Sequence, residues 1–384
     1  MRPAPGGITG MRIAQIVPSL EEQHGGPSRS VHRLAAALAA MGNEVDLLAT
    51  LPGTAAAPTG RERLRVLQFR RDRPGVLCPS GGLRDHLRHQ NYDCLHHHSL
   101  WLRTLHYARE AASARSALVI SPRGMMTDWA WHHHRWKKWL AARLVHPGAL
   151  ALARGWHATS TAEADDIRRR GFQQPICVSP NGVEAPAPEE MTRAHDIWSQ
   201  LCPAVTTRPV ALFYSRFHRK KRLRELIDLW VAVAPADWLL LVAGIPEEYS
   251  VPEIQAQVLR QGASDRIAVV DGRGRPPPYG VASLFLLPSH SENFGMVIAE
   301  AMAWGVPVVV TDTTPWAEVA ARHAGWCVPW SGFRDALQEA LGTSADQLEQ
   351  QGARARQWIL SRFSWAQAAQ PLGEFYQRLL NPQP

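Results

Sequence analysis

Two glutamates carry the strongest chemical pattern in this chain of 384 residues. Glu292 lies in a loop after an apolar predicted strand, and Glu300 lies eight residues later on the helix that follows, about two helical turns along. A carboxylate in the loop and a carboxylate two turns along the helix are expected to contact different groups. The alternative is that Glu292 caps the helix and Glu300 is a solvated surface residue. The small and apolar neighbours of Glu300 argue against that alternative, because buried carboxylates need partners.

The backbone between these glutamates is the second part of the pattern. Asn293, Phe294 and Gly295 open the predicted helix. Their N–H groups form a positively polarised pocket that suits an anion or sugar oxygens.

Two basic residues follow another predicted strand, at 209–214. Arg216 and Lys221 are five residues apart in the loop between this strand and a helix. Arginine offers a forked contact to phosphate oxygens, and lysine offers a point charge. The alternative is a solvated basic patch, because four more basic or histidine residues lie in the same loop.

Weaker patterns lie in the first half of the chain. Gly25 and Gly26 follow the first predicted strand and would let a ligand approach the backbone, although an ordinary turn is the default interpretation. Three successive histidines, 96–98, end another strand. Side chains alternate faces in a strand, so the three cannot easily bind one metal ion. One histidine in a binding site is favoured, and a histidine without function is the alternative.

The elements that position these residues alternate as strand and helix in two runs. The pattern predicts an α/β protein with a Rossmann-like domain at 11–185, a linker at 186–208 and a second Rossmann-like domain at 209–363. A final helix at 364–384 is expected to pack back on the first domain. Ligands bind beyond the carboxyl ends of the strands in such sheets, so the two domains should face each other across a ligand-binding cleft.

Composition separates the two halves of the chain. Residues 1–190 contain 24 Lys and Arg against 16 Asp and Glu, whereas the rest contains 18 of each, so the net charge of +8 lies in the first half. This charge favours an anionic partner on that side. The five cysteines are widely spaced, without a CxxC pair, and indicate a reducing cytosol. No signal sequence or membrane span is predicted.

Residues 129–145 combine tryptophans with basic residues. Trp129, Trp136 and apolar residues alternate with Arg135, Lys137, Lys138 and Arg143 within a region, 128–153, of helical character. This composition is typical of an amphipathic helix at an anionic membrane surface. The alternative is a helix packed on its own domain with a solvated basic face.

Taken together, these motifs resemble the family 4 retaining glycosyltransferases of the GT-B fold. The likeness rests on the two glutamates, the loop at 216–221 and the glycine pair, and on three further segments: SPRGMM at 121–126, ATSTAEADDI at 158–167 and SPNGVE at 179–184. It covers the chain from Met11 almost to its end.

The resemblance implies roles for the residues of the second half. Arg216 and Lys221 would hold the donor diphosphate and stabilise the leaving group. Glu300 would bind the ribose, and Glu292 would bind the transferred sugar beside the N–H groups of Asn293, Phe294, Gly295 and Met296. Departures from the family are Ser215-Arg216-Phe217 for Gly-Arg-Leu, Lys221-Arg222 for Lys-Gly and Glu292-Asn293-Phe294-Gly295 for Glu-Gly-Phe-Gly.

It also implies roles in the first half. Gly25 and Gly26 would line the phosphate and acceptor side of the site. His98 would act as a catalytic group near the 6-position of the sugar, and Arg123 and Gly124 would lie on the acceptor side.

The implied activity is retaining, metal-independent hexose transfer from a UDP- or GDP-hexose to a glycan acceptor, with no cofactor. We expect a lipid-linked acceptor of polysaccharide or lipopolysaccharide assembly, and a cytoplasmic enzyme that is peripheral on the inner face of the membrane. Nucleic acid is not expected as a partner. The alternatives are a GT-B sugar-nucleotide epimerase, a non-catalytic scaffold that binds a partner, and a basic nucleic-acid-binding protein.

Overall fold

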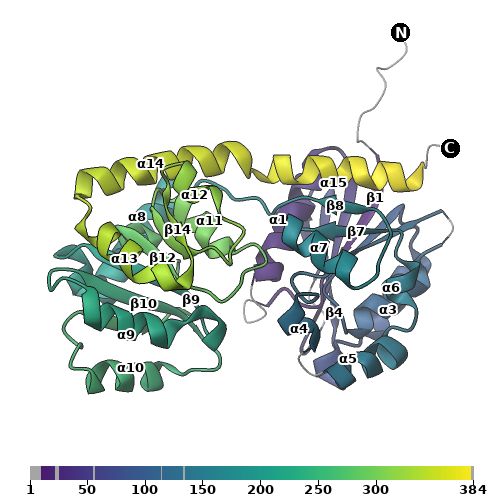
Figure 1. Cartoon of the computed structure of the whole chain (residues 1–384). Helices are drawn as coiled ribbons and strands as arrows, with labels where there is room; N and C mark the ends of the chain where they lie inside the picture. The colour runs from purple at the N-terminus through teal and green to yellow at the C-terminus, as the bar shows by residue number, and fades with distance from the viewer. Residues whose placement is uncertain (1–9, 22–25, 55–56, 114, 133–134, 382–384) are drawn as a thin grey trace, which may run out of the picture. The chain divides into compact units, whose positions relative to one another are not determined.

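The protein folds into two compact α/β units. The computed structural model describes residues 10–21, 26–54, 57–113, 115–132 and 135–381. One unit comprises Met1–Gly182 with Trp365–Pro384, and the other comprises Val183–Ser364 (Figure 1). The C-terminal segment therefore belongs to the first unit. The two-unit α/β architecture agrees with the sequence prediction.

An eight-stranded sheet forms the core of the first unit, in the order β3-β4-β2-β1-β5-β6-β7-β8. All pairs are parallel except β3 with β4. Its central strands are buried on both faces, as parallel strands covered by helices must be. The strands are β1 (Arg12–Ile16), β2 (Glu44–Leu51), β3 (Thr59–Arg61), β4 (Leu64–Arg70), β5 (Cys94–His98), β6 (Ala117–Ser121), β7 (Gly155–Ala158) and β8 (Ile176–Val178).

Helices connect these strands as right-handed crossovers require. They are α1 (Gly26–Ala40), α2 (Gly81–His89), α3 (Arg103–Ala111), α4 (Asp128–His132), α5 (Arg135–Leu140), α6 (Ala149–Leu152), α7 (Thr161–Arg169) and the C-terminal α15 (Trp365–Leu380). None of the described helices is long and apolar enough to cross a bilayer.

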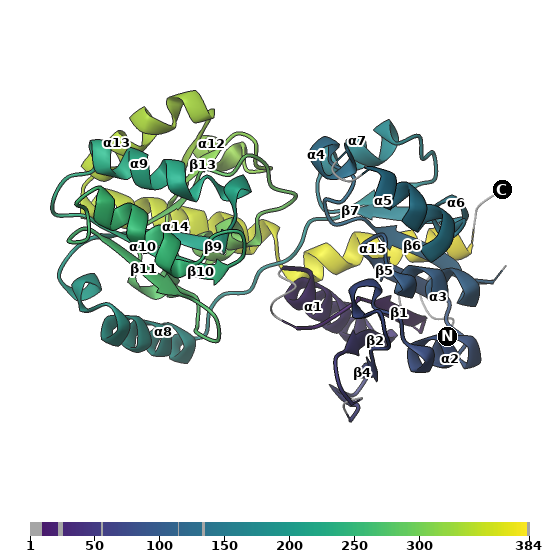
Figure 2. The same ribbon diagram turned by 90° about the horizontal axis from the view of Figure 1, so that it is seen from below.

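The C-terminal helix packs closely within the first unit, where α15 lies beside α1 (Figure 1, Figure 2). Two glycines make this approach possible. A Cβ on Gly155 would lie 2.5 Å from Phe375, and one on Gly182 would lie 2.6 Å from Trp365. Real Cβ atoms do not approach so closely, so α15 can occupy this position only because neither residue has a side chain.

A six-stranded parallel sheet forms the core of the second unit, in the order β11-β10-β9-β12-β13-β14. Counted along the chain within this unit, that is the 3-2-1-4-5-6 order of a Rossmann sheet. Its strands are β9 (Val210–Phe217), β10 (Leu239–Pro246), β11 (Ile267–Asp271), β12 (Leu284–Leu287), β13 (Val308–Thr311) and β14 (Gly325–Val328). Its helices are α8 (Pro188–Leu201), α9 (Leu223–Val233), α10 (Val251–Arg260), α11 (Met296–Ala303), α12 (Glu318–Ala321), α13 (Phe333–Gly342) and α14 (Ala345–Arg362).

Two segments differ from the sequence expectation. The segment 186–208, predicted as a linker, contains α8 and belongs to the second unit, because Trp198 is fully buried there and its Nε1 donates to the Pro276 carbonyl at 2.8 Å. The described residues of 135–153 do not form one regular helix. Helix α5 passes into a π-helical turn at Ala141–Val145, and Pro147 and Gly148 stand between this turn and α6.

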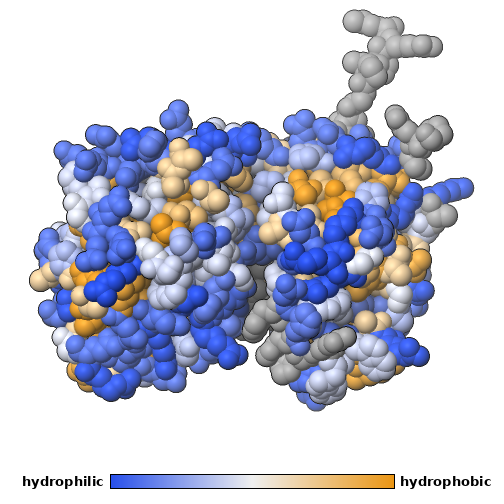
Figure 3. Space-filling view, viewed as in Figure 1, coloured by the Kyte–Doolittle hydropathy of each residue, from blue (hydrophilic) through white to orange (hydrophobic). Residues whose placement is uncertain are grey.

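The sheet orders determine where the predicted site residues lie. The order reverses between β1 and β5 in the first unit and between β9 and β12 in the second. Loops that leave neighbouring strands at such a point diverge and open a crevice at the carboxyl edge of the sheet. The segments with His98, with Arg216 and with Glu292 lie at these two points. Elsewhere, the face in Figure 3 is mainly hydrophilic, with smaller hydrophobic patches.

Candidate functional site

A buried ion pair joins the two loops at the crevice of the second unit. Lys221 ends a single 3-10 turn after β9, and its Nζ contacts the Glu292 carboxylate in the loop after β12. Their side chains are only 9% and 10% exposed. The Ser289 hydroxyl donates to the same carboxylate oxygen at 2.6 Å. A charge pair this dry persists only when hydrogen bonds complete its coordination, so the two loops are held together.

Opposing effects act on the pKa of Glu292. Burial raises the pKa, but the charge of Lys221 and the hydrogen bonds from Lys221 and Ser289 outweigh burial, so the pKa lies below its usual value. Burial also lowers the pKa of the neighbouring Lys220 ammonium. Glu292 is therefore an ionised hydrogen-bond acceptor at neutral pH.

Hydrogen bonds from the ends of the two neighbouring strands, β9 and β13, fix the loop that carries Glu292. His290 N–H donates to the Lys220 carbonyl at 2.8 Å, which ties this loop to the end of β9. The hydroxyls of Thr311 and Thr313, at the end of β13, both donate to the Ser289 carbonyl at 2.7 Å. The carboxylate consequently has a defined position.

The start of α11 lies next to this carboxylate. Gly295 caps the helix with a φ of 76°, and a Cβ there would lie 3.0 Å from Ile298 and 3.4 Å from the Glu292 side chain. The Phe294 ring is buried against Trp316, whose Nε1 donates to the Phe294 carbonyl at 2.6 Å. Phe294 can therefore offer a ligand only its backbone, as the sequence analysis expects.

Glu300 has separate partners. Its carboxylate accepts a hydrogen bond from the hydroxyl of buried Tyr279 at 2.9 Å. Glu300 itself is partly exposed on α11. The structure thus gives the two glutamates different partners, as their spacing predicts.

Arg216 does not join the Lys221–Glu292 pair. Its Nη1 donates to both carboxylate oxygens of Glu247, at 2.8 and 2.9 Å. These side chains are 46% and 40% exposed, so the pair is solvated and easily exchanged.

Of the first unit's predicted site residues, the glycine pair is the least described. Gly25 lies outside the described residues, and Gly26 is the first residue of α1. The better-defined part is a chain of buried hydrogen bonds that begins at Arg123.

This chain passes from Arg123 to the C-terminal helix. Arg123 donates from Nε and Nη2 to His98 Nδ1, at 3.2 and 2.9 Å. His98 Nε2 lies 2.7 Å from Gln15 Oε1, and Gln15 Nε2 lies 3.1 Å from the Tyr376 hydroxyl. A guanidinium can only donate, so His98 Nδ1 must accept and Nε2 must carry the proton.

The same logic orders the second half of the chain. Tyr376 receives a hydrogen bond from Gln15, so its own proton goes to His96 Nδ1 at 2.6 Å. His96 Nε2 then donates to Ser121 Oγ at 2.9 Å, and Ser121 donates to His157 Nδ1 at 2.7 Å. His157 Nε2 ends the chain on the Ser179 carbonyl at 2.9 Å. Every link runs in one direction, with three neutral histidines.

The electrostatic environment agrees with this proton arrangement. Burial, assisted by the charge of Arg123, lowers the pKa of His157 to about 3. Burial, followed by neighbouring histidines and Arg123, holds the pKa values of His96 and His98 well below the usual range. These rings stay neutral at physiological pH.

The middle histidine of the run points elsewhere. His97 Nε2 lies 2.9 Å from Thr104 Oγ1, and burial lowers its pKa to about 3. The alternation of faces expected of a strand is therefore present. Among the described residues, no group of three His, Cys, Asp or Glu side chains is arranged to hold a metal ion.

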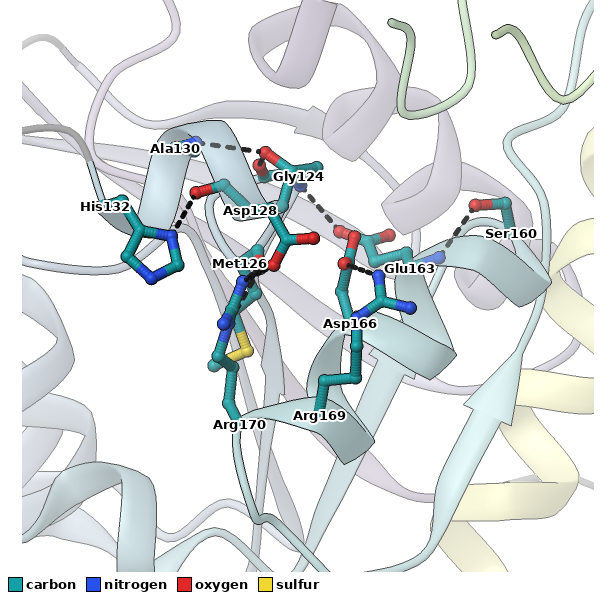
Figure 4. A network of polar contacts seen from close by, with 11 residues as sticks. Gly124, Met126, Asp128, Ala130, His132, Ser160, Glu163, Asp166, Arg169 and Arg170 are labelled. Carbon is teal, nitrogen blue, oxygen red and sulfur yellow. Dashed lines mark hydrogen bonds and ion pairs between the residues drawn. The ribbon is translucent and has the colours of Figure 1, made fainter. Parts of the chain in front are cut away.

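Helix α7 holds the segment that carries Arg123 (Figure 4). Glu163, in its first turn, accepts the Gly124 N–H at 2.6 Å. At its other end, Arg170 Nη2 donates to the Met126 carbonyl at 3.1 Å and to Asp128 at 2.5 Å. The left-handed backbone of Arg123 and Gly124, with φ of 53° and 79°, is fixed between these contacts.

The tryptophan-rich segment divides between packing and exposure. Trp131 packs under Arg170, 5.1 Å from its guanidinium. Trp136 and Trp139 are 66% and 64% exposed, and Leu144 is 62% exposed. The side chains of Trp129 and Arg135, and residues 133–134, lie outside the described part. Trp131 therefore fits a helix packed on its own domain, whereas the exposed Trp136 and Trp139 fit a helix at a membrane surface.

Sequence patterns did not find several residues that complete these sites. Ser289, Tyr279 and Glu247 are single residues of common types without a distinctive spacing. Gln15 and Tyr376 are 361 positions apart and meet only through the fold. The Ser289 hydroxyl, three residues before Glu292, was the one that local sequence could have indicated.

Family models match both halves of the chain. The model described as Glycosyltransferase Family 4 matches residues 24–185, and the model described as Glycosyl transferases group 1 matches residues 208–344. The two matches contain every predicted site residue.

Two relatives extend the likeness. The chain is 27% identical to a GDP-mannose:cellobiosyl-diphosphopolyprenol alpha-mannosyltransferase of Komagataeibacter xylinus, over 66% of this chain and 68% of that protein. It is 26% identical to a D-inositol 3-phosphate glycosyltransferase of Xylanimonas cellulosilytica, over 94% of this chain and 93% of that protein.

A solved structure shares the fold. Sucrose-phosphate synthase of Thermosynechococcus elongatus superposes with a TM-score of 0.75 at 19% identity, over 97% of this chain and all of that one. The chain has two Rossmann-type units and matches family models in both halves, and it belongs to the family 4 glycosyltransferases of the GT-B fold.

Proposed function

We propose that this protein transfers a hexose from a nucleotide-sugar to a glycan acceptor with retention of anomeric configuration. The observation that carries the proposal is the buried Lys221–Glu292 pair at the crevice of a Rossmann sheet. A dry, ordered carboxylate beside a lysine and a helix N-terminus suits a sugar joined to a diphosphate.

The chemistry follows from the charges. When the bond between sugar and diphosphate breaks, negative charge develops on the departing phosphate. Lys221 and Arg216 would stabilise this charge, with the N–H groups at the start of α11. Glu292 would accept hydrogen bonds from hydroxyls of the hexose, and Glu300 from the ribose. No step assigned to these residues requires a metal ion or another cofactor.

Arg216 must change partner when the donor binds. In the structure its guanidinium is paired with Glu247, and a diphosphate would replace this exposed carboxylate. The exchange costs little because solvated ion pairs contribute about 0–1 kcal/mol.

The role that we propose for His98 differs from the catalytic role that the family resemblance implies. Both of its ring nitrogens are already bonded, one to Gln15 and one to Arg123. We therefore propose that it acts near the hexose mainly by orienting Arg123, and that Gly124 and Arg123 lie on the acceptor side.

The relatives narrow the substrates that we propose. One is named for GDP-mannose and a lipid-linked diphosphate acceptor, which favours a GDP- or UDP-hexose and a lipid-linked glycan. The other is named for a phosphorylated inositol. Both acceptors carry phosphate, in keeping with the positive charge of residues 1–190.

A membrane-surface role for residues 129–145 is part of the proposal. Exposed Trp136 and Trp139 have Lys137 and Arg143 beside their rings, at 5.6 and 5.9 Å. This combination places aromatic rings at headgroup depth and cations near anionic lipid, on the cytoplasmic face. Trp136→Ala with Trp139→Ala should abolish sedimentation with phosphatidylglycerol vesicles. Unchanged sedimentation would exclude this surface.

Two other functions remain to be separated by experiment. A sugar-nucleotide epimerase would convert the donor without any acceptor. A nucleic-acid-binding protein would bind oligonucleotides with steep salt dependence, as its basic charge allows. Neither is favoured by a specific contact among the described residues.

The proposal is tested by a thermal-shift screen of UDP-, GDP- and ADP-sugars. A ligand that binds the folded state raises the melting temperature according to its occupancy. Wild-type protein and an Arg260→Ala control, altered at an exposed position on α10, should respond to one nucleotide series, and Lys221→Ala should not. Equal responses in all three proteins would place the donor elsewhere.

A further inference from the structure

The Arg123 guanidinium is held only by neutral groups. Its Nε and Nη2 donate to His98 Nδ1, and its Nη1 donates to Asn181 Oδ1 at 2.8 Å. Within the described part of the chain, no ion pair joins Arg123 to a carboxylate. A partly buried cation with neutral partners is unusual, because burial of charge normally requires a counter-charge.

Burial also destabilises the charged form of this cation. It lowers the pKa of Arg123 to about 10, although the nearby Glu163 carboxylate acts to raise it. Glu163 is committed to other donors: it accepts from Gly124 N–H at 2.6 Å and from Thr159 N–H at 2.7 Å. The nearest carboxylate therefore offsets the charge of Arg123 only from a distance.

The partners of Arg123 cannot adjust to neutralise it. His98 Nδ1 is locked as an acceptor, because its Nε2 proton is committed to Gln15 and the chain continues in one direction to Tyr376. The charge also lowers the pKa values of His96, His98 and His157. Protonation of these rings is thus disfavoured, and the region keeps a single fixed positive charge.

The guanidinium has donors left for a ligand. It carries five N–H bonds, of which Nε uses one, Nη2 one and Nη1 one in the contacts above. One N–H remains on each terminal nitrogen, the pair that a forked contact to two oxygens of one anion uses. Partial exposure of Arg123 makes such a contact sterically accessible.

The backbone around Arg123 is strained, which is typical of binding sites. Ser99 and Trp101, which follow β5, have φ values of 93° and 68°, and Arg123, which follows β6, has a φ of 53°. Non-glycine residues adopt this region rarely and at an energetic cost, and they cluster where a ligand is bound. Three of them lie after two adjacent strands at one edge of the sheet.

We propose that Arg123 binds an anionic group of the acceptor, a phosphate or a carboxylate, through its two remaining N–H donors. This inference rests on the proposed function, because it assigns a chemical class to the acceptor of that reaction. Gln15, His98 and Tyr376 are the positioning residues that hold the guanidinium for this contact. A phosphate would come from a lipid-linked phosphate or diphosphate, and a carboxylate from an acidic sugar.

The test is a titration of the full chain, labelled with ¹⁵N at histidine, in the presence of saturating UDP. The probes are phenyl phosphate, methyl glucuronoside and the neutral methyl glucoside. An anion that takes up the N–H donors of Arg123 changes the field at His98 Nδ1 and shifts its resonance, while saturating UDP keeps the phosphate site proposed beside Lys221 occupied throughout. Arg115→Gln, at an exposed arginine of the same unit, is the control.

The expected result is a saturable shift with at least one anion and none with methyl glucoside, in wild type and Arg115→Gln. Arg123→Gln should bind at least tenfold more weakly, and Arg123→Lys should be intermediate, since lysine lacks the fork. The anion that binds identifies the source. The inference is wrong if neither anion shifts the resonance in wild type, or if Arg123→Gln retains the same affinity. The titration requires no transfer, so failure of the proposed function leaves its outcome readable.

Discussion

Replacing Tyr376 by Phe tests whether the buried hydrogen-bond chain is continuous. The substitution keeps the ring and removes one hydroxyl, which is fully buried and joins Gln15 Nε2 at 3.1 Å to His96 Nδ1 at 2.6 Å. A donor on Gln15 and an acceptor on His96 lose their partner. Each unpaired buried group costs about 1–3 kcal/mol, and relief of the hydroxyl's own desolvation offsets roughly one such term.

The net loss for Tyr376→Phe is therefore about 1–3 kcal/mol in the free energy of unfolding of the first unit. For a unit of this size, this corresponds to a fall of roughly 2–12 °C in melting temperature. Urea unfolding followed by circular dichroism measures the loss. Tyr249→Phe is the control, because Tyr249 stacks under Arg224 and the change leaves that contact, with an expected effect within about 0.5 kcal/mol.

A loss of less than about 0.5 kcal/mol for Tyr376→Phe would refute the reasoning. It would mean that water, or a rotation of the Gln15 amide, replaces the hydroxyl at no cost. The proton order from Arg123 to Ser179 would then be wrong as well, because that order depends on the phenol as a link.

Three further results are expected. Glu247→Gln should release Arg216 from its ion pair and lower the KM for the donor about two- to fivefold without changing kcat. A raised KM would contradict this expectation and show that Glu247 assists donor binding. Gly295→Ala should cost about 1 kcal/mol or more in unfolding free energy, because of the positive φ and the Cβ contact with Ile298. The control Gly342→Ala, with open space around the residue, should be neutral or stabilising. Equal effects of the two substitutions would contradict the strain argument. Unfolding free energy should also fall by about 1.2 kcal/mol per buried histidine between pH 7 and 5.5, since a histidine with a lowered pKa stabilises the fold above about pH 6.5 and loses this contribution as pH falls. A flat profile in urea unfolding would contradict their burial. The four histidines concerned are fully buried: His96, His97, His98 and His157.

Much of the fold could be predicted from the sequence because the strands are continuous apolar runs between glycine-rich turns. The two sheets and the candidate site at the end of β12 follow from such runs. Strands β3 and β4 were missed, since β3 has only three residues and β4 alternates polar and apolar residues at one side of the sheet. The helical character of 186–208 was also missed, because its prolines suggested a linker, although Pro188 stands at the first position of α8, where proline is tolerated.

The site was predictable only where chemistry is local in sequence. Lys221 and Glu292 could be selected as candidates because each lies in a short loop between a strand and a helix. The pairing of Arg216 with Glu247, and the path from Arg123 to Tyr376, depend on residues that the chain brings together from distant segments. The periodicity of apolar residues cannot predict such contacts, because it shows which face of a helix or strand is buried and not which distant residues contact that face.

The central claim is that the Lys221–Glu292 pair forms the donor site of a glycosyltransferase. The most direct measurement is the release of nucleoside diphosphate by mass spectrometry, together with transfer of isotope-labelled hexose from UDP- and GDP-hexoses to polyprenyl diphosphate saccharides. Wild type should release one nucleoside diphosphate per hexose transferred, and Lys221→Ala should be slower by roughly 100- to 1,000-fold while it remains folded. Transfer by Lys221→Ala at the wild-type rate, or conversion of the donor without an acceptor, would contradict the claim.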